Sequence, residues 1–211
     1  MKLVSFFRGF VLSSLVLFSG VSSATLIEFG SSANNPFSFN FRNFENVIGD
    51  IDLTITAGVF SDRRSSITLA DSGDERRLGI ENNDGLGVLG FFGADTNSEI
   101  DGRDNNDIVI FTFSEAVLFT GIEFGNVDRQ DDFHFGLVDG DTFVRTLVDT
   151  RISSDSFTFD SPLFGTVFAV GAVESNDSFT INGINVVPEP SSLFLLAILL
   201  IGFSVRKKFV K

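Results

Sequence analysis

Acidic side chains are concentrated in two stretches of the sequence, and their oxygens are the groups best suited to chemistry. Five acids lie within 13 residues before a strongly apolar segment, and three lie within five residues in GNVDRQDDF. Calcium takes about six to eight oxygen ligands, which loops of Asp, Asn, Glu and Gly can supply. The spacing does not match an EF-hand loop, so only the composition indicates calcium. The candidate ligands are Asp95, Glu99, Asp101, Asp104, Asp107, Asp128, Asp131 and Asp132.

The same carboxylates fit a second interpretation, in which they are solvated turn residues that cap strands. Arg103 and Arg129 lie among them and would balance part of their charge. Calcium is therefore the only cofactor that the sequence suggests, and it competes with a purely structural role for the two loops.

Catalytic chemistry has little support. The chain has no cysteine and one histidine, His134, which excludes thiol catalysis, cysteine-based zinc sites and multi-histidine zinc sites. A glycosidase needs two carboxylates across a cleft, but with 27 acids between the terminal segments some pair is always eligible. We therefore expect no enzyme and assign no catalytic residue. In FHF, His134 alternates with Phe133 and Phe135, which predicts a solvent-facing histidine.

The segments that flank these loops have the residue pattern of β-strands. Short runs alternate apolar and polar residues between Gly, Asn, Asp and Pro, and no run has helical spacing. All 27 aromatic residues are Phe, a side chain without a polar group that is suited to filling a core. We predict an all-β fold, an antiparallel β-sandwich or jelly-roll-like single domain. The predicted strands are 37–41, 51–56, 66–70, 108–113, 117–125, 133–138, 141–148, 156–159, 165–173 and 178–186, with a hairpin turn at Asp139-Gly140.

Two connections are long or polar enough to stand out. The segment from Asp71 to Asp107 exceeds the usual loop length, so we expect a further strand near Leu86 to Phe92, with the rest functional or mobile. The second is Gly125 to Phe133. Between the terminal segments the chain has 27 acidic residues against nine arginines, a balance that repels nucleic acid.

The C-terminal end has the order of a membrane signal. A Pro-Glu-Pro step precedes an apolar run, Leu193 to Val205, which at 13 residues is short against the ~20 needed to span a bilayer. Basic residues follow, as they do on the cytoplasmic side of membrane segments. This order resembles the PEP-CTERM sorting domain of Gram-negative bacteria, which implies recognition by a membrane-embedded exosortase. The residues concerned are Val187, Pro188, Glu189 and Pro190, then Arg206, Lys207, Lys208 and Lys211.

The N-terminal end predicts a signal peptide. Lys2 and Arg8 precede an apolar stretch, Phe10 to Phe18, and small residues end at Ala24. We expect a signal peptide at 1–24, an exported β-sandwich domain at 25–186, and at 187–211 a sorting signal with a short transmembrane helix and a basic cytoplasmic tail. The expected route is export, an inner-membrane-anchored intermediate, and then the cell surface or the extracellular space.

A second resemblance covers roughly 50 residues inside the domain. GLGV from Gly85, EID from Glu99 and DRQDDF from Asp128, with a pair of apolar strands before the last, look like a recurring extracellular domain of proteins with this sorting tail. The resemblance implies an exported β-sandwich of no established activity and adds no catalytic residue.

Three functions follow for the domain. The first is a structural or interaction module of the cell surface or extracellular matrix, the second a calcium-dependent module that binds exopolysaccharide, and the third a hydrolase. The expected partners are exosortase, the membrane through the C-terminal helix, and extracellular polysaccharide, with no nucleic acid.

Overall fold

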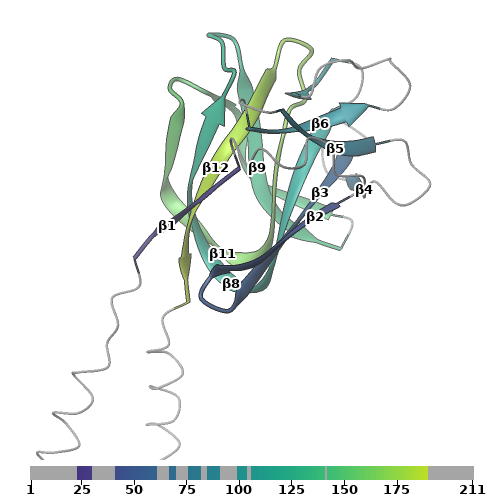
Figure 1. Cartoon of the computed structure of the whole chain (residues 1–211). Helices are drawn as coiled ribbons and strands as arrows, with labels where there is room; N and C mark the ends of the chain where they lie inside the picture. The colour runs from purple at the N-terminus through teal and green to yellow at the C-terminus, as the bar shows by residue number, and fades with distance from the viewer. Residues whose placement is uncertain are drawn as a thin grey trace, which may run out of the picture. The chain divides into compact units, whose positions relative to one another are not determined.

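The computed structural model describes residues 23–29, 41–60, 67–69, 76–81, 85–90, 99–103, 106–140 and 142–189. Residues Ala24–Val187 form one compact unit, and its described residues contain strands and no helix (Figure 1). The strands are β1 (Thr25–Glu28), β2 (Phe41–Ile48), β3 (Ile51–Phe60), β4 (Ile67–Leu69), β5 (Arg76–Glu81), β6 (Gly85–Gly90), β7 (Ile100–Asp101), β8 (Asp107–Gly125), β9 (Asp132–Asp139), β10 (Thr142–Arg151), β11 (Ser156–Gly171) and β12 (Ser178–Pro188).

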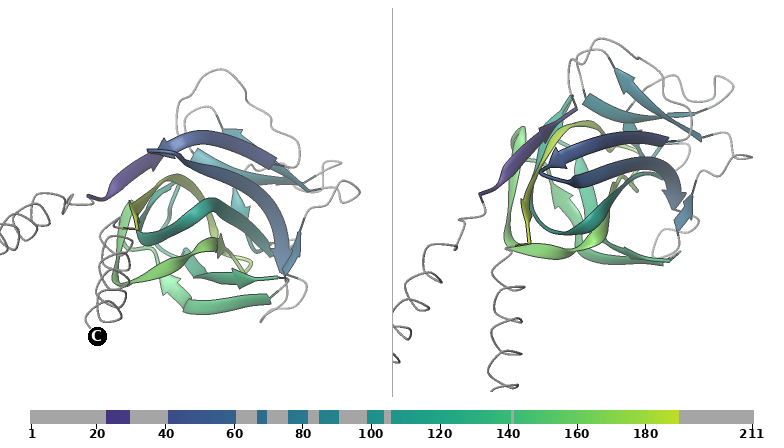
Figure 2. Two further views of the ribbon diagram at one scale, coloured as in Figure 1. Left: turned by 90° about the horizontal axis from the view of Figure 1, so that it is seen from below. Right: turned by 60° about the horizontal axis from the view of Figure 1, so that its bottom comes forward.

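A long antiparallel ribbon of β8 and β11 connects the two layers of the domain. The first half of β8, from Asp107 to Phe113, pairs with β3, and the matching end of β11 pairs with β9. The second half of β8 lies beside β12, where Thr120 Oγ1 donates to the Asn185 carbonyl at 3.0 Å. One continuous hydrogen-bonded sheet therefore folds over on itself (Figure 2). The prediction of an all-β antiparallel fold is confirmed.

The ribbon bends where its pairing is interrupted. Thr112 of β8 pairs with Val167 of β11, and the next pair is Val117 with Gly165. Between these two pairs β8 has more residues than β11, so Ser114 to Ala116 have no partner in β11. An extra length on one strand of an antiparallel pair bends that strand. The bend returns both ends of β8 toward the same end of the domain, and this places the loop after Gly125 near the turn that precedes β12.

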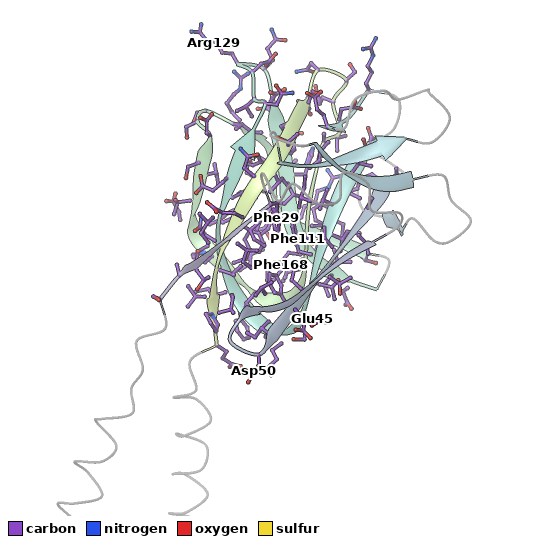
Figure 3. All side chains as sticks on the ribbon, viewed as in Figure 1. Phe29, Glu45, Asp50, Phe111, Arg129 and Phe168 are labelled. Atoms are coloured by element: carbon purple, nitrogen blue, oxygen red, sulfur yellow. The ribbon has the colours of Figure 1, made fainter. Side chains whose placement is uncertain are left out.

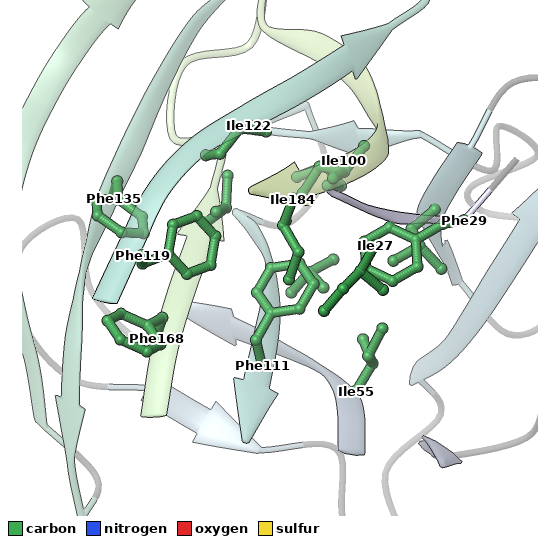
Figure 4. Packing of buried hydrophobic residues seen from close by; sticks show 14 of the residues in the cluster. Ile27, Phe29, Ile55, Ile100, Phe111, Phe119, Ile122, Phe135, Phe168 and Ile184 are labelled. Atoms are coloured by element: carbon green, nitrogen blue, oxygen red, sulfur yellow. The ribbon is translucent and has the colours of Figure 1, made fainter. Parts of the chain in front are cut away.

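Phenylalanine fills the space between the layers. Phe119 is fully buried and its ring lies 5.0 Å from the rings of Phe135 and Phe168, with Phe111 and Phe159 at 6.1 and 5.9 Å (Figure 4). Ring centroids 4.5 to 7 Å apart are the favourable range for aromatic pairs. The interpretation of Phe as a packing residue is confirmed for these side chains.

A second, smaller apolar cluster covers the other face of the β8 and β11 ribbon. It consists of Phe60, Ile108, Ile110, Phe143 and Ala169. Because both faces are covered here, β8 is buried without alternation from Asp107 to Phe111.

His134 lies against this second cluster, and the prediction of a solvent-facing histidine is wrong. Only 2% of the residue is exposed, because Phe60 of β3 packs edge-on against its ring at 6.3 Å. Its Nε2 lies 3.1 Å from Asp149 Oδ1. Burial and the nearby Arg145 lower the pKa of His134, and the effect of Asp149 opposes them. Strand alternation correctly separates His134 from Phe133, but it does not reveal that the second face is covered.

Most predicted strands are confirmed, but β1 was not predicted and several other features differ. The predicted pairs 108–113 with 117–125, and 156–159 with 165–173, are single strands, β8 and β11, because the polar residues between each pair lie at irregularities in the ribbon. The strand expected near Leu86 is β6, and β5 and β7 accompany it in the same segment. Of the run predicted at 37–41, only Phe41 lies among the described residues, where it begins β2. The predicted hairpin turn at Asp139-Gly140 begins one residue later, because Asp139 belongs to β9 and pairs with Thr142; Gly140 has a φ of 58°.

Replacing Phe119 with alanine should lower the free energy of unfolding by about 3–5 kcal/mol, because it leaves a cavity among four other rings. Phe164→Ala is the matched control, since that side chain is 51% exposed and its loss should cost within about 0.5 kcal/mol. Urea unfolding of the two variants and of the wild type measures both values. Equal losses in the two variants would contradict the placement of the core.

Candidate functional site

Three loops meet at one end of the domain, remote from the chain ends of the unit. They are residues 99–103 around β7, residues 126–131 after β8, and residues 172–177 before β12. Asp101 pairs with Ser178, the first residue of β12, whereas Val186 near its other end pairs with Thr25. Figure 3 shows Arg129 at this end and Asp50, in the β2–β3 turn, at the opposite end. Asn126 begins the middle loop in the left-handed region at φ 51°, which asparagine tolerates well.

Two buried aspartates join the loops by reciprocal hydrogen bonds. Asp131 Oδ1 accepts the N–H of Ser178 at 2.9 Å, and Asp177 Oδ1 accepts the N–H of Asp132 at 3.1 Å. Each carboxylate thus binds the backbone of the residue that follows the other aspartate. Both residues are 1% exposed. We call Asp131 and Asp177 the aspartate clasp.

The second oxygen of each clasp carboxylate holds its own loop. Asp131 Oδ2 accepts the N–H of Asp128, and Asp177 Oδ2 accepts the N–H of Glu174 at 3.0 Å. Burial raises the pKa of both carboxyl groups, and the backbone hydrogen bonds, which favour the charged form, oppose that rise. The clasp therefore uses carboxylates to cap backbone N–H groups.

The loop at 99–103 joins the clasp through Glu99. Its carboxylate accepts hydrogen bonds from Asn126 Nδ2 and Ser178 Oγ. Asp101 is 7% exposed, and its Oδ1 accepts the N–H of Arg103 at 3.0 Å. A Cβ at Gly102 would lie 2.3 Å from the Glu174 carbonyl oxygen, so the close approach of these loops requires glycine there.

The structure brings together part of the predicted calcium set. Glu99, Asp101, Asp128, Asp131 and Asp132 lie in the meeting loops or at their ends. Asp107 is buried as the first residue of β8, where its carbonyl accepts the N–H of Ala172 at 3.0 Å. Asp95 and Asp104 lie outside the described residues.

No three acidic or histidine side chains within the described part of the chain are grouped so that they could hold a metal ion. The interpretation of the acids as turn and capping residues agrees with the contacts of Asp101, Asp131 and Asp177. Calcium binding by the full set stays a prediction.

A hollow of about 380 Å³ lies beside the clasp, and the sequence did not predict it. It lies between the loop after β8 and the turn from β10 to β11. Arg151 Nε lies 3.3 Å from Asp132 Oδ1, and its Nη1 donates to the Arg129 carbonyl at 2.5 Å, which connects the two walls. In the sequence Arg129 and Arg151 are 22 residues apart, and no motif links them, so their proximity could not be predicted. The lining residues are Val127, Asp128, Arg129, Arg151, Ile152, Ser153, Ser154 and Asp155.

The C-terminal segment is identified by comparison with known families. Residues 186–208 match the family model described as the PEP-CTERM protein-sorting motif. The chain carries a PEP-CTERM sorting motif. The match confirms the resemblance seen in the sequence and supports export and sorting through exosortase. Comparisons with characterised proteins and with solved structures gave no match.

The PEP-CTERM motif begins inside the folded domain. Val186, Val187 and Pro188 are the last residues of β12, and Glu189 is the last residue that the structure describes at this end. Pro190, the predicted helix at Leu193 to Val205, the basic tail and the predicted signal peptide lie outside the described residues. No described segment forms a helix with the length and apolarity needed to cross a membrane.

Asp177→Ala should lower the free energy of unfolding at pH 7 by about 1–3 kcal/mol, because two backbone N–H groups lose their acceptor. Burial raises the folded-state pKa of Asp177 above its ordinary value of 3.8. As the pH is lowered, the folded domain therefore binds a proton at Asp177 at a higher pH than the unfolded chain does. This preferential protonation stabilises the folded domain at low pH, and the stabilisation is lost as the pH rises through the folded-state pKa. The advantage of the wild type over Asp177→Ala should be larger near pH 4 than at pH 7.

Denaturant unfolding at both pH values measures this difference. Asp160→Ala on the exposed face of β11 is the control, with an expected change within about 0.5 kcal/mol at either pH. An advantage that grows with pH would mean that the charged carboxylate is the favoured form in the folded domain.

Proposed function

We propose that residues 25–186 form an exported, non-enzymatic interaction or structural module of the cell surface or matrix, delivered by its PEP-CTERM motif. The pairing of Thr25 with Val186 carries this proposal. The chain enters and leaves the domain at one end, and the three loops with the hollow lie at the other end of β12. An 11-residue strand is roughly 30 Å long. A domain attached or processed at one end can therefore present its loops at the other.

Exosortase is the proposed processing partner, and the proposed route passes through an inner-membrane-anchored intermediate. The fold supports processing at a defined place. The motif overlaps the end of β12 without a linker, since its first residues, Val186 to Pro188, still belong to the strand. Proline cannot donate a backbone hydrogen bond to a neighbouring strand, and Pro188 is the last residue of β12. The domain can thus be complete before the tail is removed.

Replacing Pro188, Glu189 and Pro190 with alanine should leave the exported protein in the inner membrane, because the recognition sequence is lost while the apolar run and basic tail remain. Cell fractionation and the intact mass of the mature protein measure the outcome. The matched control replaces Asp160, Ser161 and Pro162, an exposed Pro-containing triplet of β11, and should be delivered normally. Normal delivery of the first variant would refute the proposed role of the motif.

The hollow beside the clasp favours a second candidate function, carbohydrate binding. Its volume of about 380 Å³ lies within the usual range for small-ligand sites. Two arginines, two aspartates and two serines offer donors and acceptors for sugar hydroxyls, and Val127 and Ile152 offer apolar contact. Calcium in the acidic loops would be a cofactor of this function.

Calorimetry of the exported domain with neutral and acidic oligosaccharides, each with and without millimolar calcium, tests the second candidate. Binding should fall at least tenfold in an Arg151→Gln, Ser154→Ala variant, because both side chains line the hollow. Asp160→Ala, remote from the lining residues, should bind as the wild type does. Absence of heat with every sugar would remove carbohydrate binding, and equal binding with and without calcium would remove the cofactor.

A further inference from the structure

Two exposed apolar side chains lie near the end of β12 from which the sorting motif continues. The exposed large apolar side chains of the described residues are Leu26, Val144, Val148 and Phe164. Val144 and Val148 belong to β10, at one edge of the sheet. Leu26 belongs to β1 and Phe164 to β11, and these two are placed beside the C-terminal end of β12 by the strand pairing.

The pairing puts the two side chains at one level of the sheet. Leu26 pairs with Asn185 of β12, whose carbonyl accepts the hydrogen bond from Thr120 Oγ1 of β8. Leu118, two residues before Thr120, pairs with Phe164. The strands β1, β12, β8 and β11 are neighbours in this order (Figure 1), so the exposed residues lie within one short stretch of four adjacent strands.

These side chains share the outer face of the sheet. Ile27, next to Leu26, is in the core, and Leu163, next to Phe164, packs against it. Successive side chains of a strand point to opposite faces, so Leu26 and Phe164 point away from the core. Leu118 is half-buried between two core residues of β8 and points outward for the same reason. We call Leu26, Leu118 and Phe164 the outer apolar patch.

The outer apolar patch is held close to the segment that is expected to enter the membrane. Three residues separate Glu189 from the start of the apolar run at Leu193, a step of at most about 14 Å. Asn185, which pairs with Leu26, precedes Glu189 by four residues, or roughly 13 Å of extended chain. An inserted tail therefore keeps the patch within roughly 30 Å of the bilayer.

The chemistry of the patch fits a lipid surface with neutral headgroups. The chain has no lysine between Thr25 and Glu189, and the exposed charges nearest in sequence, Glu28 and Glu115, are acidic. Surface binding to a membrane depends on buried apolar area and on attraction to anionic lipids, and only the first is available here. Two or three side chains would bind a free domain weakly, but a tether raises the effective concentration at the membrane.

We propose that the outer apolar patch is a membrane-contacting surface, on which the domain rests against the bilayer while its C-terminal tail is inserted. This inference rests on the inner-membrane-anchored intermediate proposed above. The contact tilts the domain onto the face formed by β1, β12, β8 and β11. The three loops lie at the other end of β12 and stay clear of the bilayer in this position.

Fluorescence tests the proposal, because the chain has no Trp and no Tyr. The tail-bearing chain is recovered from the inner membrane and reconstituted in phosphatidylcholine vesicles with plain or brominated acyl chains. Phe164→Trp should emit at shorter wavelength on reconstitution and should be quenched by the brominated lipid. Leu26→Trp is a second probe of the patch and should behave in the same way. Val144→Trp, an exposed position of β10, is the matched control and should show neither change.

Flotation of the vesicles separates this inference from the proposal on which it rests. A chain that does not float with the vesicles would refute the anchored intermediate, and the membrane contact with it. If the chain floats and the patch probes are quenched no more than Val144→Trp, only the membrane contact is overturned. Probes shielded from acrylamide but not quenched by brominated lipid would show that a second copy of the chain covers the patch, which also overturns the proposal. Circular dichroism shows that each variant is folded.

Discussion

The distal end of this domain depends on the reciprocal hydrogen bonds between Asp131 and Asp177. Each carboxylate binds the backbone of the other loop with one oxygen and its own loop with the second. Without such acceptors, the N–H groups of Asp132 at the start of β9 and of Ser178 at the start of β12 would lose their partners, at a cost that loops cannot easily recover from apolar contacts. The two loops and Glu99 form one connected polar network around this pair.

This arrangement explains part of the acidic composition in structural terms. A carboxylate is an acceptor with two oxygens, so one buried aspartate can satisfy two N–H groups that point at it from different segments. The desolvation of the charge is the cost, and the raised pKa of both carboxyl groups reflects it. Exposed acids such as Asp128 contribute charge to the surface around the hollow.

The strands were predictable because alternation reports which face of a strand is buried. IDLTIT and SFTINGINV place their apolar residues on the core side, as β3 and β12 do. The burial of the other face of β9, where His134 lies, was not predictable. It depends on Phe60, which packs against His134 from a segment distant in the sequence. The fusion of two predicted strands into β8 was hidden for a related reason. The polar residues Ser114 and Glu115 look like a turn, and only the pairing with β3 and β11 shows a bend.

The site was predictable in composition and not in geometry. The sequence pointed to Asp131 and Asp132, and it gave no reason to add Asp177, which lies 45 positions beyond Asp132 and forms half of the clasp. Likewise, Arg151 belongs to the hollow only because β10 returns the chain to the loop after β8. Contacts between distant segments depend on the packing of the whole sheet, so they cannot be predicted from local residue spacing.

The position of β12 has a mechanical consequence. The strand has hydrogen-bonded neighbours along both edges, including β1, β6, β7 and β8, and the sorting motif continues directly from its end. A pull applied to the loops against a held tail would run along the strand, so many hydrogen bonds would share the load in shear and would not open one at a time. The domain is therefore expected to resist extension along the axis that joins the C-terminal end of β12 to the three loops.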